Sequence, residues 1–138
     1  MKSTNECIQY IINKCKSIPH GDSNFANHLM GVYSLMLYSN APEHLCLAGL
    51  FHSIYGSEAF DPKLNITREE VIDYIGKEAE ELVFLFCFFR NRDNTILKSK
   101  NKDLIYLSII HLQALYNSMK DENILSVIED YKKVYHLL

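Results

Sequence analysis

Histidines are concentrated between residues 20 and 60, where the chain is expected to begin or end helices. His20 precedes one expected helix, His28 lies on it, and His52 stands near the end of the next one. A neutral imidazole is the commonest metal ligand in proteins and also carries protons near neutral pH. Helical domains build metal sites in their cores from side chains that different helices contribute. His20, His28 and His52 are therefore candidates for a shared site that holds a metal ion or transfers protons. The alternative is that each is a surface histidine or a core histidine with its hydrogen bonds satisfied.

The residues around His52 have the character of the wall and floor of a site. An almost wholly apolar segment, residues 45–51, leads to His52, and polar side chains follow it at Ser53, Tyr55 and Glu58. A buried imidazole needs partners there, because an unpaired one costs about 1–3 kcal/mol. Glu58 is the candidate for proton transfer, and Tyr55 for a hydrogen bond to substrate. A solvated Glu58 and a packed Tyr55 are the alternatives.

Later side chains extend the candidate site. His111 stands among apolar residues in the segment 109–112, so it is either a fourth metal ligand or a core histidine bonded to a backbone carbonyl. Arg90 and Arg92 stand at the start of a polar segment, and guanidinium groups can clamp a phosphate. A solvated run of charges is the alternative for these arginines. Ser53, Arg90 and Arg92 are thus the candidates for substrate binding.

Two runs of residues carry a resemblance to a known family. They are His28-Leu29-Met30-Gly31-Val32-Tyr33 and, ending 24 residues after His28, Leu47-Ala48-Gly49-Leu50-Phe51-His52. In this order and spacing they resemble the HD superfamily, and the similarity covers roughly residues 20–115. The resemblance implies a helical bundle that binds divalent metal through histidines and aspartates and hydrolyses phosphate esters, often of nucleotides. Some relatives instead hold two irons and use dioxygen.

One position departs from that family. The superfamily's aspartate falls on Ser53, which is a poor metal ligand. Residues 52–60 look closer to a subgroup of small HD-like proteins with a His-Ser-x-Tyr-Gly-Thr/Ser-Glu-Ala-Phe run, which also have a histidine like His20, eight residues before His28. That resemblance implies a fold and a pocket more than a reaction. A histidine set without the aspartate suits zinc or iron, with manganese as a third candidate.

Three functions follow from these residues and the resemblance. The first is metal-dependent hydrolysis of a small phosphate ester or nucleotide-like substrate, with His20, His28 and His52 as ligands, His111 as a fourth, and Glu58 as the proton-transfer group. The second is a metal-free acid/base enzyme or a protein that binds a small ligand. The third is an iron-dependent oxygenase.

Helical periodicity dominates the whole chain and predicts an all-α bundle of about six to seven helices, HD-like in its arrangement. The first helix carries Cys7 to Cys15 on one face and is capped by Ser3 or Thr4. Further helices are expected near residues 28–40, 45–54, 67–76, 77–89, 103–119 and 123–137. Residues 91–102 are predicted to form a polar loop, Asp103 to be an N-cap, and no sheet is expected.

Composition limits the remaining possibilities. The chain has 138 residues, of which 48% are hydrophobic and 22% charged, which predicts one domain over residues 1–138. A net charge of -3 disfavours nucleic-acid binding. No apolar run is long enough to span a bilayer, so no membrane partner is expected. The four cysteines form no CxxC pair and are expected to be buried thiols in a cytoplasmic protein. The partner is expected to be a small molecule, and the C-terminal helix is either a packing element or a homodimer face.

Overall fold

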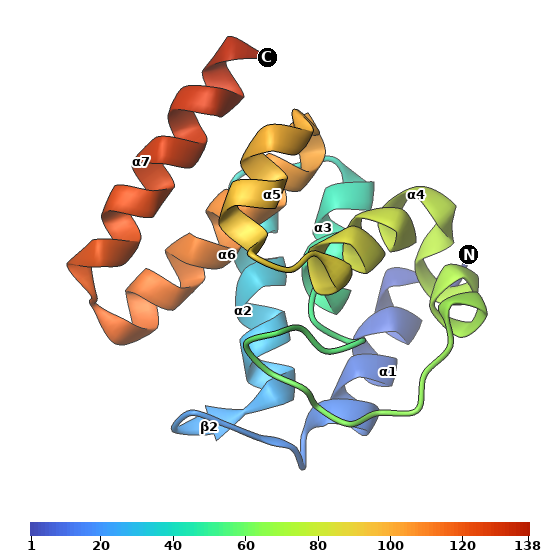
Figure 1. Ribbon diagram of the computed structural model, residues 1–138. Coiled ribbons are helices and arrows are strands. Elements are labelled where there is room, and N and C mark those ends of the chain that lie inside the picture. Colours follow the sequence, from blue (N-terminus) through green and yellow to red (C-terminus); the bar gives the residue numbers. More distant parts are fainter.

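The computed structural model describes all 138 residues, and helices dominate it (Figure 1). The seven helices are α1 Thr4–Cys15, α2 Phe25–Tyr38, α3 Glu43–Phe51, α4 Arg68–Phe88, α5 Arg92–Ser99, α6 Lys102–Met119 and α7 Glu122–Leu137. Between α1 and α2 the strands β1 Pro19–His20 and β2 Ser23–Asn24 pair antiparallel. Thirty buried residues form one hydrophobic core. The prediction of an all-α bundle is confirmed.

Helix ends follow the capping residues seen in the sequence. The Ser3 side chain accepts a hydrogen bond from the backbone N–H of Glu6, and the Glu6 carboxylate accepts one from the backbone of Ser3. Thr67 accepts a hydrogen bond from the backbone N–H of Glu70 at the start of α4. Gly76, with φ 83° and ψ 166°, then divides α4 into two helical halves. This division agrees with the two helices predicted on either side of Gly76.

Helix α3 lies at the centre, between α2 and α4 (Figure 1). Every residue from Leu45 to Phe51 is buried, as a helix that is apolar on all faces requires. Gly49 allows α2 to approach closely, because a Cβ added there would lie 3.1 Å from Met36 Cγ and 3.3 Å from Val32 Cγ1. This packing fixes the end of α3, and therefore His52, against α2.

Two glycines in this helix pair should respond to substitution in opposite ways. We expect Gly49→Ala to lower the free energy of unfolding by about 1–3 kcal/mol, because its methyl group meets Met36 and Val32. Gly31→Ala on α2 should raise it by about 0.5–1 kcal/mol, because nothing lies within 4 Å of the added Cβ. Urea denaturation of the two variants measures both values, and equal shifts would contradict this packing.

Three local predictions are wrong. Residues 19–24 form a short hairpin where no sheet was expected, because Gly21 (φ 57°) makes a turn between strands too short to show any alternation. Residues 92–99 form α5 where a polar loop was expected, and this helix buries only Ile96, so it has almost no apolar periodicity. Asn101 rather than Asp103 caps α6, since Asp103 pairs with His44 at 2.8 Å.

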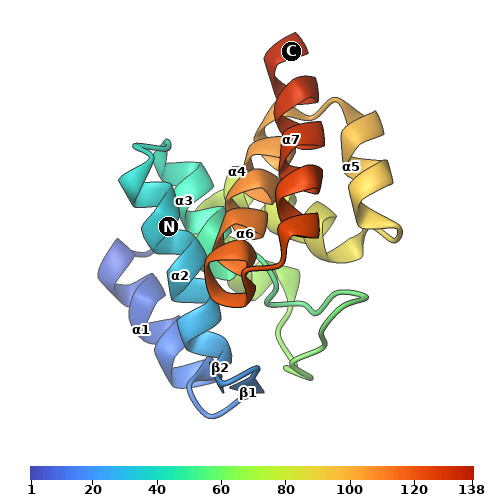
Figure 2. The same ribbon diagram turned by 90° about the vertical axis from the view of Figure 1, so that its left-hand side faces the viewer.

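Helix α7 lies on the outside of the molecule against α6, with α5 nearby (Figure 2). Its Tyr131 hydroxyl donates a hydrogen bond of 2.6 Å to Asp93 on α5, which ties the last helix to the segment after α4. All four cysteines are free and buried, as predicted. No helix of the chain combines the length and apolar character needed to cross a bilayer.

Candidate metal centre

Three histidines from different helices converge in the interior. His28 lies on α2, His52 directly follows α3, and His111 lies on α6. Each offers one ring nitrogen, and the three nitrogens lie within 4.8 Å of one another. The Nε2 atoms of His28 and His52 are 3.0 Å apart. Two nitrogens bound to one ion at about 2.0–2.1 Å lie about 2.9–3.4 Å apart, so the spacing of this pair is compatible with one ion. The His111 nitrogen lies no more than 4.8 Å from either of them.

The orientation of His52 is fixed by the helix that it ends. Its ring Nδ1–H donates a hydrogen bond of 2.7 Å to the carbonyl of Gly49, and the residue is wholly buried. The donated proton places the free lone pair on Nε2, the atom that faces His28. Metal-binding histidines commonly hold their second nitrogen in this way, on a backbone carbonyl or carboxylate. This hydrogen bond therefore holds the ring with its Nε2 atom directed at His28.

The histidines of this centre are neutral at neutral pH. Burial, with a smaller contribution from the nearby His20, lowers the pKa of His28 to about 4. Burial is also the main cause that holds the pKa of His52 and of His111 well below the usual value, and the neighbouring histidines add to it. Neutral imidazole is the form that binds metal, because the lone pair must be free of a proton.

His20 lies beside this trio and is not among the three converging ligands. Its ring stacks on His28 with the centroids 4.2 Å apart and meets the ring of Phe60 edge-on at 4.7 Å. His111, predicted as the fourth ligand, occupies the third place instead. The hairpin that holds His20 was not foreseen, so the sequence could not show which way this ring would face.

Three adjoining cavities are bordered by His20, His28 or His111, whereas the fully buried His52 lines none of them. The smallest, about 200 Å³, contains His20, His28, Ser53, Arg92 and His111 in its wall, and is called the histidine cavity here. A larger one of about 530 Å³, the arginine cavity, shares Arg92 and His111 with it and extends toward α5 and α7. A third of about 460 Å³, the hairpin groove, shares His20 and His28 and extends along the β1–β2 hairpin. A ligand bound beside the three histidines can thus extend into the arginine cavity on one side and into the hairpin groove on the other.

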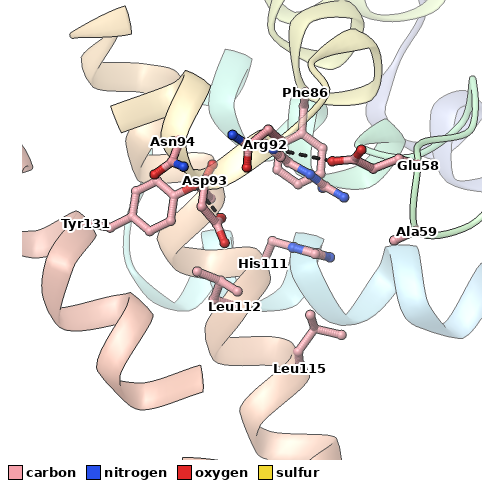
Figure 3. A pocket seen from close by; sticks show the side chains of 12 residues that line it. Glu58, Ala59, Phe86, Arg92, Asp93, Asn94, His111, Leu112, Leu115 and Tyr131 are labelled. Atoms are coloured by element: carbon pink, nitrogen blue, oxygen red, sulfur yellow. Dashed lines mark hydrogen bonds between the residues drawn. The ribbon is translucent and has the colours of Figure 1, made fainter. Parts of the chain in front are cut away.

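Arg92 contributes the positive charge of the site. Its guanidinium lies over the ring of Phe86 at 4.3 Å from the centroid and forms none of the ion pairs of the chain. Its backbone N–H donates to the Glu58 carboxylate at 3.3 Å (Figure 3). Arg92 and Glu58 both line the arginine cavity together with His111. A cation without a carboxylate partner beside neutral histidines favours an anionic ligand.

The other predicted residues have different positions. Ser53 is buried and lines the histidine cavity. Tyr55 lies outside the three cavities and donates a hydrogen bond of 2.7 Å to Glu80. Arg90 is exposed, and its guanidinium donates a hydrogen bond of 3.4 Å to the carbonyl of Cys87 at the end of α4. Tyr55 and Arg90 therefore belong to the scaffold.

Sequence reasoning missed two pairs of residues near the site. Asp93 and Tyr131 line the arginine cavity and are joined by their hydrogen bond. Glu80, only 1% exposed, accepts hydrogen bonds of 2.8 Å from Arg68 Nε and Nη2 and another from the Tyr55 hydroxyl. Neither pair has a local signal, because its members are far apart in the chain.

Comparison with known proteins gives a family. A model described as a domain of unknown function (DUF6817) matches residues 12–91, more than half of the chain. The matched segment contains His20, His28, His52 and Glu58 and ends before Arg92. No curated protein and no solved structure matches the chain. The chain belongs to the DUF6817 family of domains of unknown function.

Proposed function

We propose that this protein is a metal-dependent hydrolase of a small phosphate ester, with His28, His52 and His111 as the ligands of a divalent ion. The observation that carries the proposal is the convergence of three ring nitrogens within 4.8 Å, on a buried His52 and half-buried His28 and His111. The unpaired guanidinium of Arg92 in the wall of the same cavity supports an anionic substrate. The resemblance of residues 28–52 to the HD superfamily supports the same class of reaction.

The donor set fits zinc or iron. It also fits manganese if water and substrate supply further oxygen ligands. All three donors are imidazoles, and Ser53 adds a hydroxyl to the cavity wall where the HD superfamily has a carboxylate. Three protein ligands leave coordination positions open. When bound, such an ion supplies Lewis acidity, which lowers the pKa of water and stabilises charge on a phosphoryl group.

Residues of the arginine and histidine cavities bind the substrate and move its protons. Arg92 binds the phosphate oxygens and holds the ester over the trio, as a planar guanidinium does with two parallel hydrogen bonds. The Glu58 carboxylate, held at the start of α5 by the Arg92 N–H, takes the proton from the attacking water. The Ser53 hydroxyl hydrogen-bonds a substrate oxygen in the histidine cavity. His52 keeps its own proton on Nδ1, because the Gly49 carbonyl accepts a hydrogen bond from that N–H.

Hydrolysis of a simple phosphate ester by the metal-loaded protein tests this assignment. We expect Arg92→Ala to lower kcat/KM at least 100-fold, because a charge-assisted bidentate contact to phosphate is lost. Arg90→Ala should stay within twofold of the wild type, since Arg90 lies outside the cavity. The assay uses 4-nitrophenyl phosphate with zinc, manganese or iron(II). Equal effects of the two arginine substitutions would contradict the role of Arg92.

A metal-free acid/base function is the second candidate, and one observation favours it. The Nε2 atoms of His28 and His52 lie 3.0 Å apart, which is also hydrogen-bond distance if His28 donates. Such a pair could pass a proton without an ion. Activity that persists unchanged in the presence of a chelator would select this candidate. Oxygen consumption by the iron-loaded protein would instead select the oxygenase alternative.

A further inference from the structure

The hairpin groove is the part of the site that the reaction above leaves unused. It lies between the β1–β2 hairpin, the first half of α2 and the end of α6, and has a volume of about 460 Å³. His20 and His28 form its inner end, which it shares with the histidine cavity. A substrate whose reacting group lies at the trio can therefore extend into this groove. Its lining determines what kind of group fits.

Gly31 keeps the groove open. It lies in the middle of α2 and lines the groove, and a Cβ added there would have nothing within 4 Å. Its φ is not positive and no neighbour crowds it, so neither backbone conformation nor packing requires a glycine. Glycine is an unfavourable residue in a helix interior. Gly49, in contrast, is needed for packing, since its added Cβ would lie 3.1 Å from Met36.

The hairpin side of the groove offers both donors and acceptors. Asn24 uses its side-chain oxygen to accept the backbone N–H of Asn27, which leaves the Asn24 Nδ2 group free to donate. Asn27 uses its own Nδ2 to donate to Ser23, which leaves the Asn27 Oδ1 atom free to accept. Both amides line the groove. These groups hydrogen-bond uncharged ligands well.

The α6 side has the same mixed character. Asn117 accepts a hydrogen bond from Gln113 through Oδ1, so its Nδ2 remains free, and Ser118 offers a hydroxyl. Leu115 and Met119 add apolar surface. The groove has no lysine or arginine, and its only acidic residue is Asp22. A negative charge here repels a second phosphate, whereas Arg92 on the other side of the trio attracts one.

We propose that the hairpin groove binds the hydroxyl-rich part of the substrate, so that the substrate is a phosphorylated sugar or polyol. Hydroxyl groups both donate and accept, which matches the mixed amides, and the C–H faces of such a molecule match Leu115 and Met119. A nucleobase would need an open aromatic surface, but His20 already stacks on His28. The placement of the phosphate at Arg92 rests on the function proposed above. The assignment of the groove rests on its own lining.

Binding to the full chain tests this assignment without an enzymatic assay. Titration calorimetry and amide chemical shifts are recorded with inorganic phosphate, glucose 6-phosphate, free glucose and adenosine monophosphate. We expect glucose 6-phosphate to bind at least 10-fold tighter than inorganic phosphate and to shift amides of Asn24, Asn27 and Ser118. Gly31→Leu should abolish this gain without changing the affinity for inorganic phosphate. Ser34→Leu, an exposed α2 position outside the groove, is the matched control and should keep the gain.

The results distinguish a failure of the groove assignment from a failure of the proposed hydrolase. The assignment is supported if Gly31→Leu, but not Ser34→Leu, loses the tighter binding of glucose 6-phosphate over inorganic phosphate. It is also supported if free glucose shifts amides of the groove and Gly31→Leu removes these shifts, even if no phosphate binds. An equal affinity for glucose 6-phosphate and inorganic phosphate, with no groove shifts from glucose, would overturn it. Adenosine monophosphate that binds tighter than glucose 6-phosphate and loses its gain in Gly31→Leu would also overturn it. A failure of inorganic phosphate to bind counts against Arg92 and the hydrolase, not against the groove.

Discussion

Divalent metal should raise the melting temperature of the wild-type chain by roughly 10–20 °C, and substitution of any one of the three converging histidines should remove most of this rise. A ligand present at 1,000 times its dissociation constant stabilises the folded state by about 4 kcal/mol, which is the source of that shift. The folded chain brings the three nitrogens within 4.8 Å, whereas the unfolded chain keeps no such arrangement.

The variants for this measurement are His28→Ala, His52→Ala and His111→Ala, followed by calorimetry with zinc and then with a chelator. His44→Ala is the matched control, because His44 is also half-buried but pairs with Asp103, away from the trio. Circular dichroism of each variant at 20 °C first establishes that it is helical. A zinc shift that is as large in the three variants as in His44→Ala would show that the ion binds elsewhere.

Acid should weaken the fold in a pH range set by the histidines. The pKa of His28 is lowered by burial from 6.5 to about 4, so below pH 6.5 the unfolded chain binds a proton that the folded chain excludes. The contribution of neutral His28 to the free energy of unfolding is therefore complete above the pKa of the unfolded chain. It is lost as the pH falls toward the pKa of the folded chain. For His28 alone, the loss between pH 7 and pH 5 is about 2 kcal/mol. Burial lowers the pKa of His52 and His111 in the same direction and adds to the loss.

Urea unfolding at pH 7, 6 and 5 without metal measures this dependence. The window ends at pH 5 because carboxylates begin to titrate below it. His28→Gln should have a slope smaller by the contribution of His28, since glutamine takes up no proton. A free energy of unfolding that is constant over this range, or a slope equal in wild type and His28→Gln, would show that the imidazoles are solvated rather than buried.

The sequence predicted the central pair of the site for reasons that the structure explains. His52 follows an apolar helix, and a polar ring in that position must point inward to a partner. The family resemblance suggested that His28 is the partner of His52, because the two histidines have the order and spacing found in that family. Which histidine joins His28 and His52 depends on tertiary contacts between α2 and α6, which no local pattern reveals. His111 was therefore weighted below His20, although the structure places it in the trio.

Other residues were misplaced because their partners lie far away in the chain. Tyr55 stands next to the site in sequence, but buried Glu80, 25 residues later, draws its hydroxyl to α4. Arg90 and Arg92 have similar neighbours in the sequence. Arg92 lines the cavity because α5 begins there, whereas Arg90 precedes the helix and is exposed. That helix was missed because it buries a single residue. Local patterns thus predicted the core helices well and the short polar elements poorly.

The metal content of the tag-free protein tests the central claim most directly. Elemental analysis after incubation with zinc, iron(II) or manganese and removal of free ions should find close to one equivalent of metal in the wild type and in His44→Ala. His52→Ala should retain little, because it lacks the buried nitrogen that faces His28. The metal retained best would decide between hydrolysis and oxygen chemistry. Wild-type protein that is folded and retains no metal after this treatment would contradict the metal centre and leave the metal-free acid/base function in its place.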